Sequence, residues 1–158
     1  TMVEPSSSAS GQLCRQWISS GAPAEALALA FAADRTARSS QIRAKLAEGR
    51  HIVTDRYVLS SLVYQVADGC DPAWIEQINQ HIVKPDIVIV LSAPLETLLR
   101  RIKERGDSDR YEERSFLAKV VEMYEGWEDP SKHAVDASQS AKQVTDDILE
   151  VLAETLEQ

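Results

Sequence analysis

An acidic and a basic residue stand side by side directly after a short apolar segment. Asp55 and Arg56 follow the run His51–Thr54, which has the composition of a buried strand. Ligands of open parallel sheets bind beyond the carboxyl ends of the strands, and the fork of an arginine can bind a phosphate in two places. The pair therefore predicts a phosphate site. The plainer alternative is a helix cap for Asp55 and a surface ion pair for Arg56.

Two further pairs have the spacing of neighbours on one helix face. Ser61 and Gln65 are four residues apart with Tyr64 beside them, and hydroxyl and amide groups suit the edge of a pyrimidine. Phe31 and Arg35 are also four apart, so one face offers a ring that can stack on a base and a cation for its oxygens or phosphate. The alternative for this second pair is a core phenylalanine with a solvent-facing arginine.

A basic cluster surrounds the polar loop Gly106–Asp109. It contains six of the 17 lysines and arginines: Arg100, Arg101, Lys103, Arg105, Arg110 and Arg114. Phosphoryl transfer depends on positioning and on neutralising charge, often by an arginine on a segment that closes over the phosphates. The alternative is a solvated helix face whose cations pair with nearby acidic residues: Glu104, Asp107, Asp109, Glu112 and Glu113.

The elements that must position these residues alternate along the chain between short apolar strands and helices. The expected strands cover residues 51–54, 87–91 and 133–135. The expected helices cover residues 11–19, 24–48, 58–68, a segment that Asp71 caps and Pro72 begins, 94–105, 112–125 and a last amphipathic segment from about 144 to 156. This alternation predicts an α/β fold, a parallel sheet with helices on both faces. We expect a single domain over residues 1–158.

Composition narrows the class of protein. The 158 residues are 44% hydrophobic, enough for one core without disulfides or a structural metal. Two distant cysteines and three scattered histidines show no metal-type spacing, so we expect a reducing cytoplasm and no zinc. No apolar run approaches the roughly 20 residues of a membrane span. A net charge of −8 argues against nucleic acid as a partner.

In several ordered segments the chain resembles the thymidylate kinases. Glu4–Ser8 resembles the family's Arg-Glu-Pro segment, and Phe31–Arg35 resembles its base-binding helix segment. Asp55–Tyr57, followed by Ser60–Ser61 and Tyr64–Gln65, is the most specific match. Lys84–Asp86 before the second strand, a lid at about 101–114 and Asp136–Ser138 complete a resemblance that covers nearly the whole chain.

The resemblance implies a kinase that transfers a phosphoryl group from MgATP to dTMP, and it implies roles for individual residues. Phe31, Arg35, Arg56, Ser60, Ser61, Tyr64 and Gln65 would bind dTMP, with Arg56 on the acceptor phosphate. Asp55, Arg105 and Arg110 would be catalytic, with Asp55 near Mg²⁺ through water, and Arg101, Ala137 and Ser138 would bind ATP. The family also implies a homodimer and a three-layer P-loop-kinase-like sheet.

Two departures from the family pattern qualify this interpretation. No Gly-x-x-x-x-Gly-Lys-Ser/Thr loop, which cradles the phosphates of ATP, occurs in the 158 residues. Since the chain opens at Thr1 as if at the tail of a strand, we expect a strand-loop-helix start of roughly 30 or more residues to be missing. Val3 stands where the family usually carries arginine. The family has two catalytic arrangements, which differ in whether a key arginine lies in the phosphate loop or in the lid. The many basic residues of the lid here favour the lid arrangement.

Two other functions remain open at this point. One is a non-catalytic nucleotide-binding or dimerisation module that has lost its ATP loop, which would bind dTMP but not MgATP. The other is a kinase for another pyrimidine nucleotide or for a nucleoside, against which Phe31, Ser61 and Gln65 speak.

Overall fold

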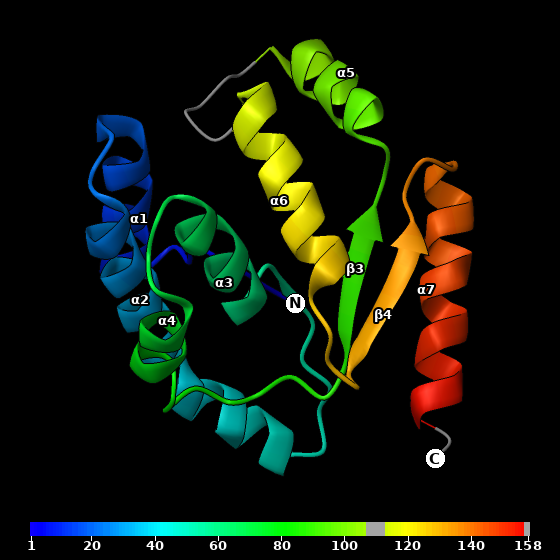
Figure 1. The fold of residues 1–158 in the computed structure, drawn as a ribbon. Coiled ribbons are helices and arrows are strands. Elements are labelled where there is room, and N and C mark those ends of the chain that lie inside the picture. Colours follow the sequence, from blue (N-terminus) through cyan, green and yellow to red (C-terminus); the bar gives the residue numbers. More distant parts are fainter. Residues whose placement is uncertain (107–112, 157–158) are drawn as a thin grey trace. The chain divides into compact units, whose positions relative to one another are not determined.

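The computed structural model describes residues 1–106 and 113–156, which form the helices and short parallel strands of a mixed α/β protein (Figure 1). These residues belong to two compact units, 1–84 and 85–158. The part of the predicted lid from 107 to 112, with the predicted catalytic Arg110, lies outside the described residues.

The first unit contains two short strands and four helices. They are β1 (Met2–Val3), α1 (Ala9–Ser20), α2 (Ala24–Ala47), β2 (Thr54–Asp55), α3 (Val58–Ala67) and α4 (Pro72–Ile78). β1 and β2 pair in parallel, with Met2 opposite Thr54 and Val3 opposite Asp55. α1 and α2 lie side by side (Figure 1). The parallel pair brings two chain segments that follow the strands to one edge.

Local capping explains where several of these helices begin and end. The Ser8 side chain accepts a hydrogen bond from the backbone N–H of Gly11 at the start of α1, and Gly21 ends that helix in the left-handed conformation (φ 69°). The Asp71 carboxylate accepts from the Trp74 N–H with Pro72 at the first position of α4. The predicted cap at Asp71 is therefore confirmed.

Small side chains let α2 approach the other helices of this unit closely. Ala24 and Ala28 of α2 form a buried cluster with Cys70 and Ile75, and α3 and α4 cover it with the partly buried Leu62, Val66, Trp74 and Ile78. This apolar cluster fixes the three helices whose polar side chains form the site described below.

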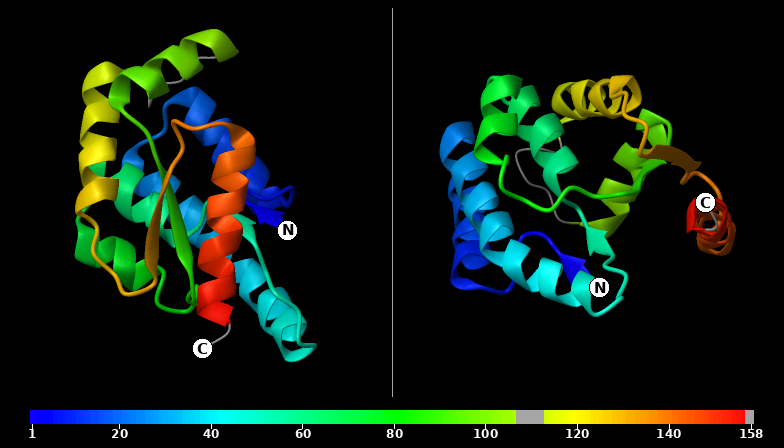
Figure 2. Two further views of the ribbon diagram at one scale, coloured as in Figure 1. Left: turned by 90° about the vertical axis from the view of Figure 1, so that its right-hand side faces the viewer. Right: turned by 90° about the horizontal axis from the view of Figure 1, so that it is seen from below.

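The second unit contains β3 (Val88–Ser92), α5 (Leu95–Arg105), α6 (Arg114–Gly126), β4 (Lys132–Asp136) and α7 (Ala141–Leu156). β3 and β4 pair in parallel over five positions, from Val88 opposite Lys132 to Ser92 opposite Asp136. α7 runs along β4, as Figure 2 shows, and α6 packs on β3. Val90, Leu117, Val120 and Val135 are buried in this unit.

The observed elements differ from the expected ones mainly at the strands. The strand expected at residues 51–54 is wrong in its start, because β2 is Thr54–Asp55. The limits of β2 follow from its hydrogen bonds with the chain around β1. Glu4 N–H donates to Asp55 O at 3.0 Å, and Met2 N–H donates to Val53 O at 2.8 Å. Among the described residues the strands form two separate two-stranded sheets. The single sheet with three layers stays a prediction.

None of the helices in the described part of the chain is long and apolar enough to cross a membrane.

Candidate substrate site

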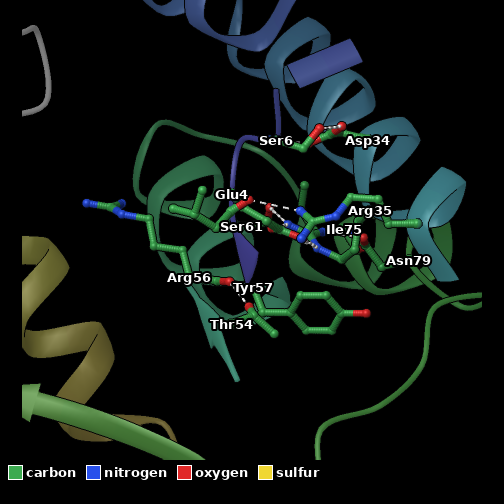
Figure 3. Close-up of polar contacts among 12 residues, drawn as sticks. Glu4, Ser6, Asp34, Arg35, Thr54, Arg56, Tyr57, Ser61, Ile75 and Asn79 are labelled. Carbon is green, nitrogen blue, oxygen red and sulfur yellow. Dashed lines mark hydrogen bonds and ion pairs between the residues drawn. The ribbon is translucent and has the colours of Figure 1, made fainter. Parts of the chain in front are cut away.

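Both strands of the first unit lead into charged residues at the same edge of their sheet. Glu4 follows β1 and Arg56 follows β2, and the parallel register places the ends of the two strands opposite each other. Figure 3 shows the side chains that gather around these strand ends. This is the edge at which parallel sheets bind their ligands.

Arg35 of α2 is the centre of a buried polar network beside this edge. Its Nε donates to both carboxylate oxygens of Glu4 at 3.1 Å, and its Nη2 donates to one of them at 2.7 Å. Nη1 donates to Asn79 Oδ1 at 2.5 Å and Nη2 to Ser61 Oγ at 3.2 Å (Figure 3). The guanidinium carbon lies 5.3 Å from the centre of the Tyr57 ring. Only 1% of Arg35 is exposed, so the alternative of a solvent-facing arginine is wrong.

The charge of Arg35 is balanced where it is buried. The side chains of Arg35 and Glu4 are 1% and 3% exposed, and an isolated ion there would carry a large desolvation penalty. Burial raises the pKa of Glu4 above its ordinary value, although the neighbouring guanidinium acts in the opposite direction. The contacts with Asn79 and Ser61 also fix the plane of the guanidinium.

Gln65 of α3 adds a buried amide to the same unit. The residue is 3% exposed, and among the described residues its Oε1 atom has no hydrogen-bond partner. Leaving a buried polar atom unsatisfied costs about 1–3 kcal/mol, so such an atom points to a missing partner. Ser61 lies one turn earlier on the same helix, and it is also buried. A heterocycle that carries both N–H and C=O groups is a suitable partner for this amide.

Arg56 has an unusual backbone between β2 and α3. It is the non-glycine residue with positive φ (62°) in the described part of the chain. Its guanidinium carbon lies 5.2 Å from the centre of the Tyr64 ring. The helix that follows has Tyr57 as its N-cap residue, with no side-chain cap hydrogen bond. The alternative in which Asp55 caps this helix is therefore wrong. A cation next to an uncapped helix N-terminus can bind an anion.

A serine cluster anchors the segment that carries Glu4. The Asp34 carboxylate accepts hydrogen bonds from the Ser6 N–H (2.7 Å) and from the hydroxyls of Ser6 (2.6 Å), Ser8 (2.8 Å) and Ser10 (2.8 Å). Burial acts to raise the pKa of Asp34, but these hydrogen bonds outweigh it and hold the pKa below the ordinary value. Arg15 also donates to Ser6 O and Pro5 O.

Three residues of this network were not among the sequence candidates. Glu4 and Asp34 stand only within segments that resemble the family, Glu4–Ser8 and Phe31–Arg35, and Asn79 belongs to none of the predicted sites. The run of serines and the Asp next to Arg35 could have indicated the Asp34 cluster, because serine hydroxyls need acceptors when they pack against a helix. No local pattern indicated Asn79, which lies 44 residues from its partner Arg35.

The other predicted dTMP-binding residues lie on α2 and α3, the helices that carry Arg35 and Gln65. Phe31 is half-buried on α2, one turn before Arg35, and Ser60 is half-buried in the first turn of α3.

Asp55 provides an exposed carboxylate next to Arg56. In phosphoryl-transfer sites Mg²⁺ is bound by one or two carboxylates together with substrate phosphates and waters. The single exposed carboxylate of Asp55 fits a position near such an ion, in contact with one of its waters. Among residues 1–106 and 113–156 no group of three or more His, Cys, Asp or Glu side chains could hold a metal ion.

The residues predicted to bind ATP come together in the second unit. Arg101 of α5 donates to Ala137 O at 2.8 Å, and Ala137 N–H donates to Ser92 O at 2.7 Å. Ser138 N–H donates to the Asp136 carboxylate at 2.8 Å. Ala137 and Ser138 therefore lie at the carboxyl ends of β3 and β4, and the side chain of Arg101 reaches them from α5.

The basic cluster divides between the predicted lid and ordinary ion pairs. Arg105 is exposed at the end of α5. Arg100 pairs with Glu104 at 3.9 Å, and Arg114 pairs with Glu96, each at exposed positions. The alternative of a solvated, paired helix face therefore applies to part of the cluster.

Comparisons with known proteins agree with one another. A family model described as thymidylate kinase matches residues 1–148. The chain is 37% identical over 158 residues to a probable thymidylate kinase of Caldivirga maquilingensis, covering 96% of this chain and 77% of that protein. It is 38% identical over 136 residues to a thymidylate kinase of Brachyspira hyodysenteriae (84% and 66% covered). It is 40% identical over 123 residues to a probable thymidylate kinase of Methanocaldococcus jannaschii (77% and 63% covered).

Proposed function

This chain belongs to the thymidylate kinase family, and on that premise we propose that it phosphorylates dTMP to dTDP with MgATP. It spans between 63% and 77% of the lengths of the three relatives named above. The activity is thus proposed for a protein that includes these 158 residues.

One helix carries the central support for this proposal. α3 has a cation, Arg56, just before its N-terminal turn. In its last turns it has a buried amide, Gln65, whose oxygen has no hydrogen-bond partner in the part of the chain that the structure describes. A nucleoside monophosphate has an anion at one end and a hydrogen-bonding base at the other. The anion of such a nucleotide therefore matches Arg56 at the start of α3, and its base matches Gln65 near the end of that helix.

The acceptor nucleotide would be held by contacts of different kinds. Arg56 binds the phosphate, assisted by the backbone N–H groups at the start of α3. Gln65 pairs with the base edge, and Arg35 presents its guanidinium to a base oxygen in an orientation that Glu4 fixes. Phe31 stacks on the base, while Ser60, Ser61 and Tyr64 line the space along α3.

In the transfer step an oxygen of the dTMP phosphate attacks the γ-phosphorus of ATP. The bond from that phosphorus to the β,γ-bridging oxygen breaks, and ADP leaves. Arg105 and Arg110 neutralise charge on the transferring group, and Arg101, Ala137 and Ser138 hold ATP. Asp55 would hold Mg²⁺ through water, and the ion would supply further neutralisation of the phosphate oxygens. The phosphate-cradling loop has to come from chain outside these 158 residues, because its motif does not occur in them.

The proposal includes a homodimer, by analogy with the family, and a cytoplasmic location, which the two distant cysteines favour.

The acceptor site is tested by calorimetry of dTMP and thymidine binding to the chain and to Arg56→Ala. We expect Arg56→Ala to weaken dTMP binding about tenfold or more, since a charge-assisted phosphate contact is worth about 1.5–3 kcal/mol. Thymidine, which lacks the phosphate, should bind weakly to both. The matched control is Arg50→Ala, an exposed arginine paired with Glu48, which should bind dTMP as the unmodified chain does. Equal dTMP affinity of Arg56→Ala and the unmodified chain would count against the site.

The activity is tested with a chain that includes a phosphate-binding loop. It should phosphorylate dTMP faster than dUMP and should not phosphorylate thymidine. If dUMP or thymidine proved the better substrate, the chain would be a kinase of another pyrimidine nucleotide or nucleoside.

A non-catalytic nucleotide-binding module is the second candidate, favoured by the absence of a phosphate-cradling motif from the 158 residues. It predicts that the natural full-length chain binds dTMP but not MgATP. Tight MgATP binding by that chain, measured by calorimetry, would reject this candidate.

A further inference from the structure

We propose that Thr54 is a positioning residue that holds Arg56 in the conformation in which it receives the acceptor phosphate. The inference rests on the proposed function, which assigns the phosphate to Arg56. It adds a residue that the sequence candidates did not include.

The backbone of Arg56 has an unfavourable conformation. Its φ of 62° lies in the left-handed region, where an arginine is strained because its Cβ crowds the backbone. A strained residue keeps such a conformation only where its surroundings hold it, and such residues cluster at functional sites.

On the strand side, Thr54 holds it through its side chain. The Thr54 hydroxyl donates a hydrogen bond to the carbonyl oxygen of Arg56, two residues along the chain (Figure 3). Thr54 itself is fixed, because it pairs with Met2 in the parallel ladder while Asp55 pairs with Val3. The hydroxyl therefore ties the strained peptide to the sheet.

On the helix side, Tyr57 fixes the next residue. Its hydroxyl donates to Val83 O at 3.0 Å, and its ring lies against the guanidinium of Arg35. Arg56 thus lies between Asp55, which the ladder anchors, and Tyr57, and its carbonyl is oriented by Thr54.

The left-handed backbone determines where the Arg56 side chain points. Figure 3 shows the side chain of Arg56 extending away from the Arg35–Glu4 pair. Its guanidinium carbon lies 5.2 Å from the centre of the Tyr64 ring. An extended backbone at residue 56 would send the side chain in another direction. Loss of the Thr54 hydroxyl should therefore loosen the guanidinium on Tyr64 and weaken its contact with a phosphate.

The test compares Thr54→Val, which keeps the branched shape, with Thr54→Ser, which keeps the hydroxyl. We expect Thr54→Val to raise the Kd for dTMP about five- to tenfold without changing the Kd for thymidine, and Thr54→Ser to stay within about twofold of the unmodified chain. Thr145→Val is the matched control, since it removes a hydroxyl that donates to Ala141 O on α7. It should leave dTMP binding unchanged.

A double-mutant cycle separates positioning from a general structural role. In an Arg56→Ala background, Thr54→Val should have no further effect on dTMP binding, because its effect acts through Arg56. The inference is overturned if Thr54→Val weakens dTMP and thymidine equally, if its effect persists in Arg56→Ala, or if Arg56→Ala weakens binding while Thr54→Val does not. If Arg56→Ala itself leaves dTMP binding intact, the proposed function fails instead.

A second readout does not depend on dTMP. By NMR, the Arg56 side-chain protons should show an upfield ring-current shift from Tyr64 in the unmodified chain and in Thr54→Ser, and a smaller shift in Thr54→Val. Identical shifts in all three would overturn the inference. If Thr54→Val does not fold, Thr54→Ala replaces it in both measurements.

Discussion

Glu4 and Arg35 form the ion pair on which the candidate site depends. Their side chains are 3% and 1% exposed, so removing one charge leaves the other buried without a counterion. We expect Glu4→Gln to lower the free energy of unfolding by about 3 kcal/mol, within the range known for broken buried pairs. Urea denaturation measures this change.

The exposed pair of Arg50 with Glu48 is the matched control for this prediction. Its side chains are 68% and 58% exposed, and Glu48→Gln should change the unfolding free energy by no more than about 0.5 kcal/mol. Similar losses in the two variants would contradict the structural role assigned to Glu4.

Asp34 gives the protein a defined dependence of stability on pH. Its pKa is lowered in the folded chain, so the unfolded chain binds the proton more tightly. The stabilisation is therefore present above the ordinary value of 3.8 and is lost as the pH falls through the lower, folded value. Asp34→Asn should show a smaller loss of stability over this acidic range, measured by urea denaturation at several pH values. Parallel curves for the two proteins would contradict this assignment.

At the scale of elements, the contact of α1 with the Ser6 turn depends on Gly11. A Cβ atom at Gly11 would lie 2.0 Å from Ser6 O, a backbone atom that cannot move aside easily. We expect Gly11→Ala to destabilise the protein by about 2–3 kcal/mol, at the upper end of the usual cost of overpacking. Thermal or urea unfolding measures the effect.

Gly126, the last residue of α6, is the control for this substitution. A Cβ there would meet nothing within 4 Å, so Gly126→Ala should change stability by no more than about 0.5 kcal/mol. If Gly11→Ala were equally neutral, the close packing of the Ser6 turn on α1 would be wrong.

The elements differ in how well the sequence predicts them. The start of α4 was predicted to the residue because its cap, Asp71, and Pro72 act locally. The bounds of β2 were missed because a two-residue strand is defined by its partner β1, some 50 residues away in the chain. Strand limits follow from pairing, which composition alone does not reveal.

At the scale of the whole molecule, the candidate residues divide between the two compact units. The dTMP candidates all belong to residues 1–84, and the ATP candidates all belong to residues 85–158. We therefore expect Arg101→Ala to leave dTMP affinity within about twofold of the unmodified chain, whereas Arg56→Ala weakens it about tenfold. Calorimetry with dTMP measures both.

A large loss of dTMP affinity in Arg101→Ala would show that the acceptor site needs groups of both units. The net charge of −8 makes this comparison informative, because an anionic substrate is held by local cations rather than by the overall field.

The sequence by itself determined the α/β class, most helices and the family, because helix periodicity, caps and the segment from Asp55 to Gln65 are local signals. It also named residues that the structure places together in the first unit, among them Arg35 and Ser61.

Only the tertiary structure decided how those residues are used. It buried Arg35 against Glu4 and Asn79, 31 and 44 residues away, and it gave Asp34 its serine donors. It also set the left-handed backbone of Arg56. The sequence does not predict this conformation, because position 56 is neither glycine nor asparagine. Such contacts join distant segments, and the free energy of burial that selects them depends on the packed chain rather than on any local spacing.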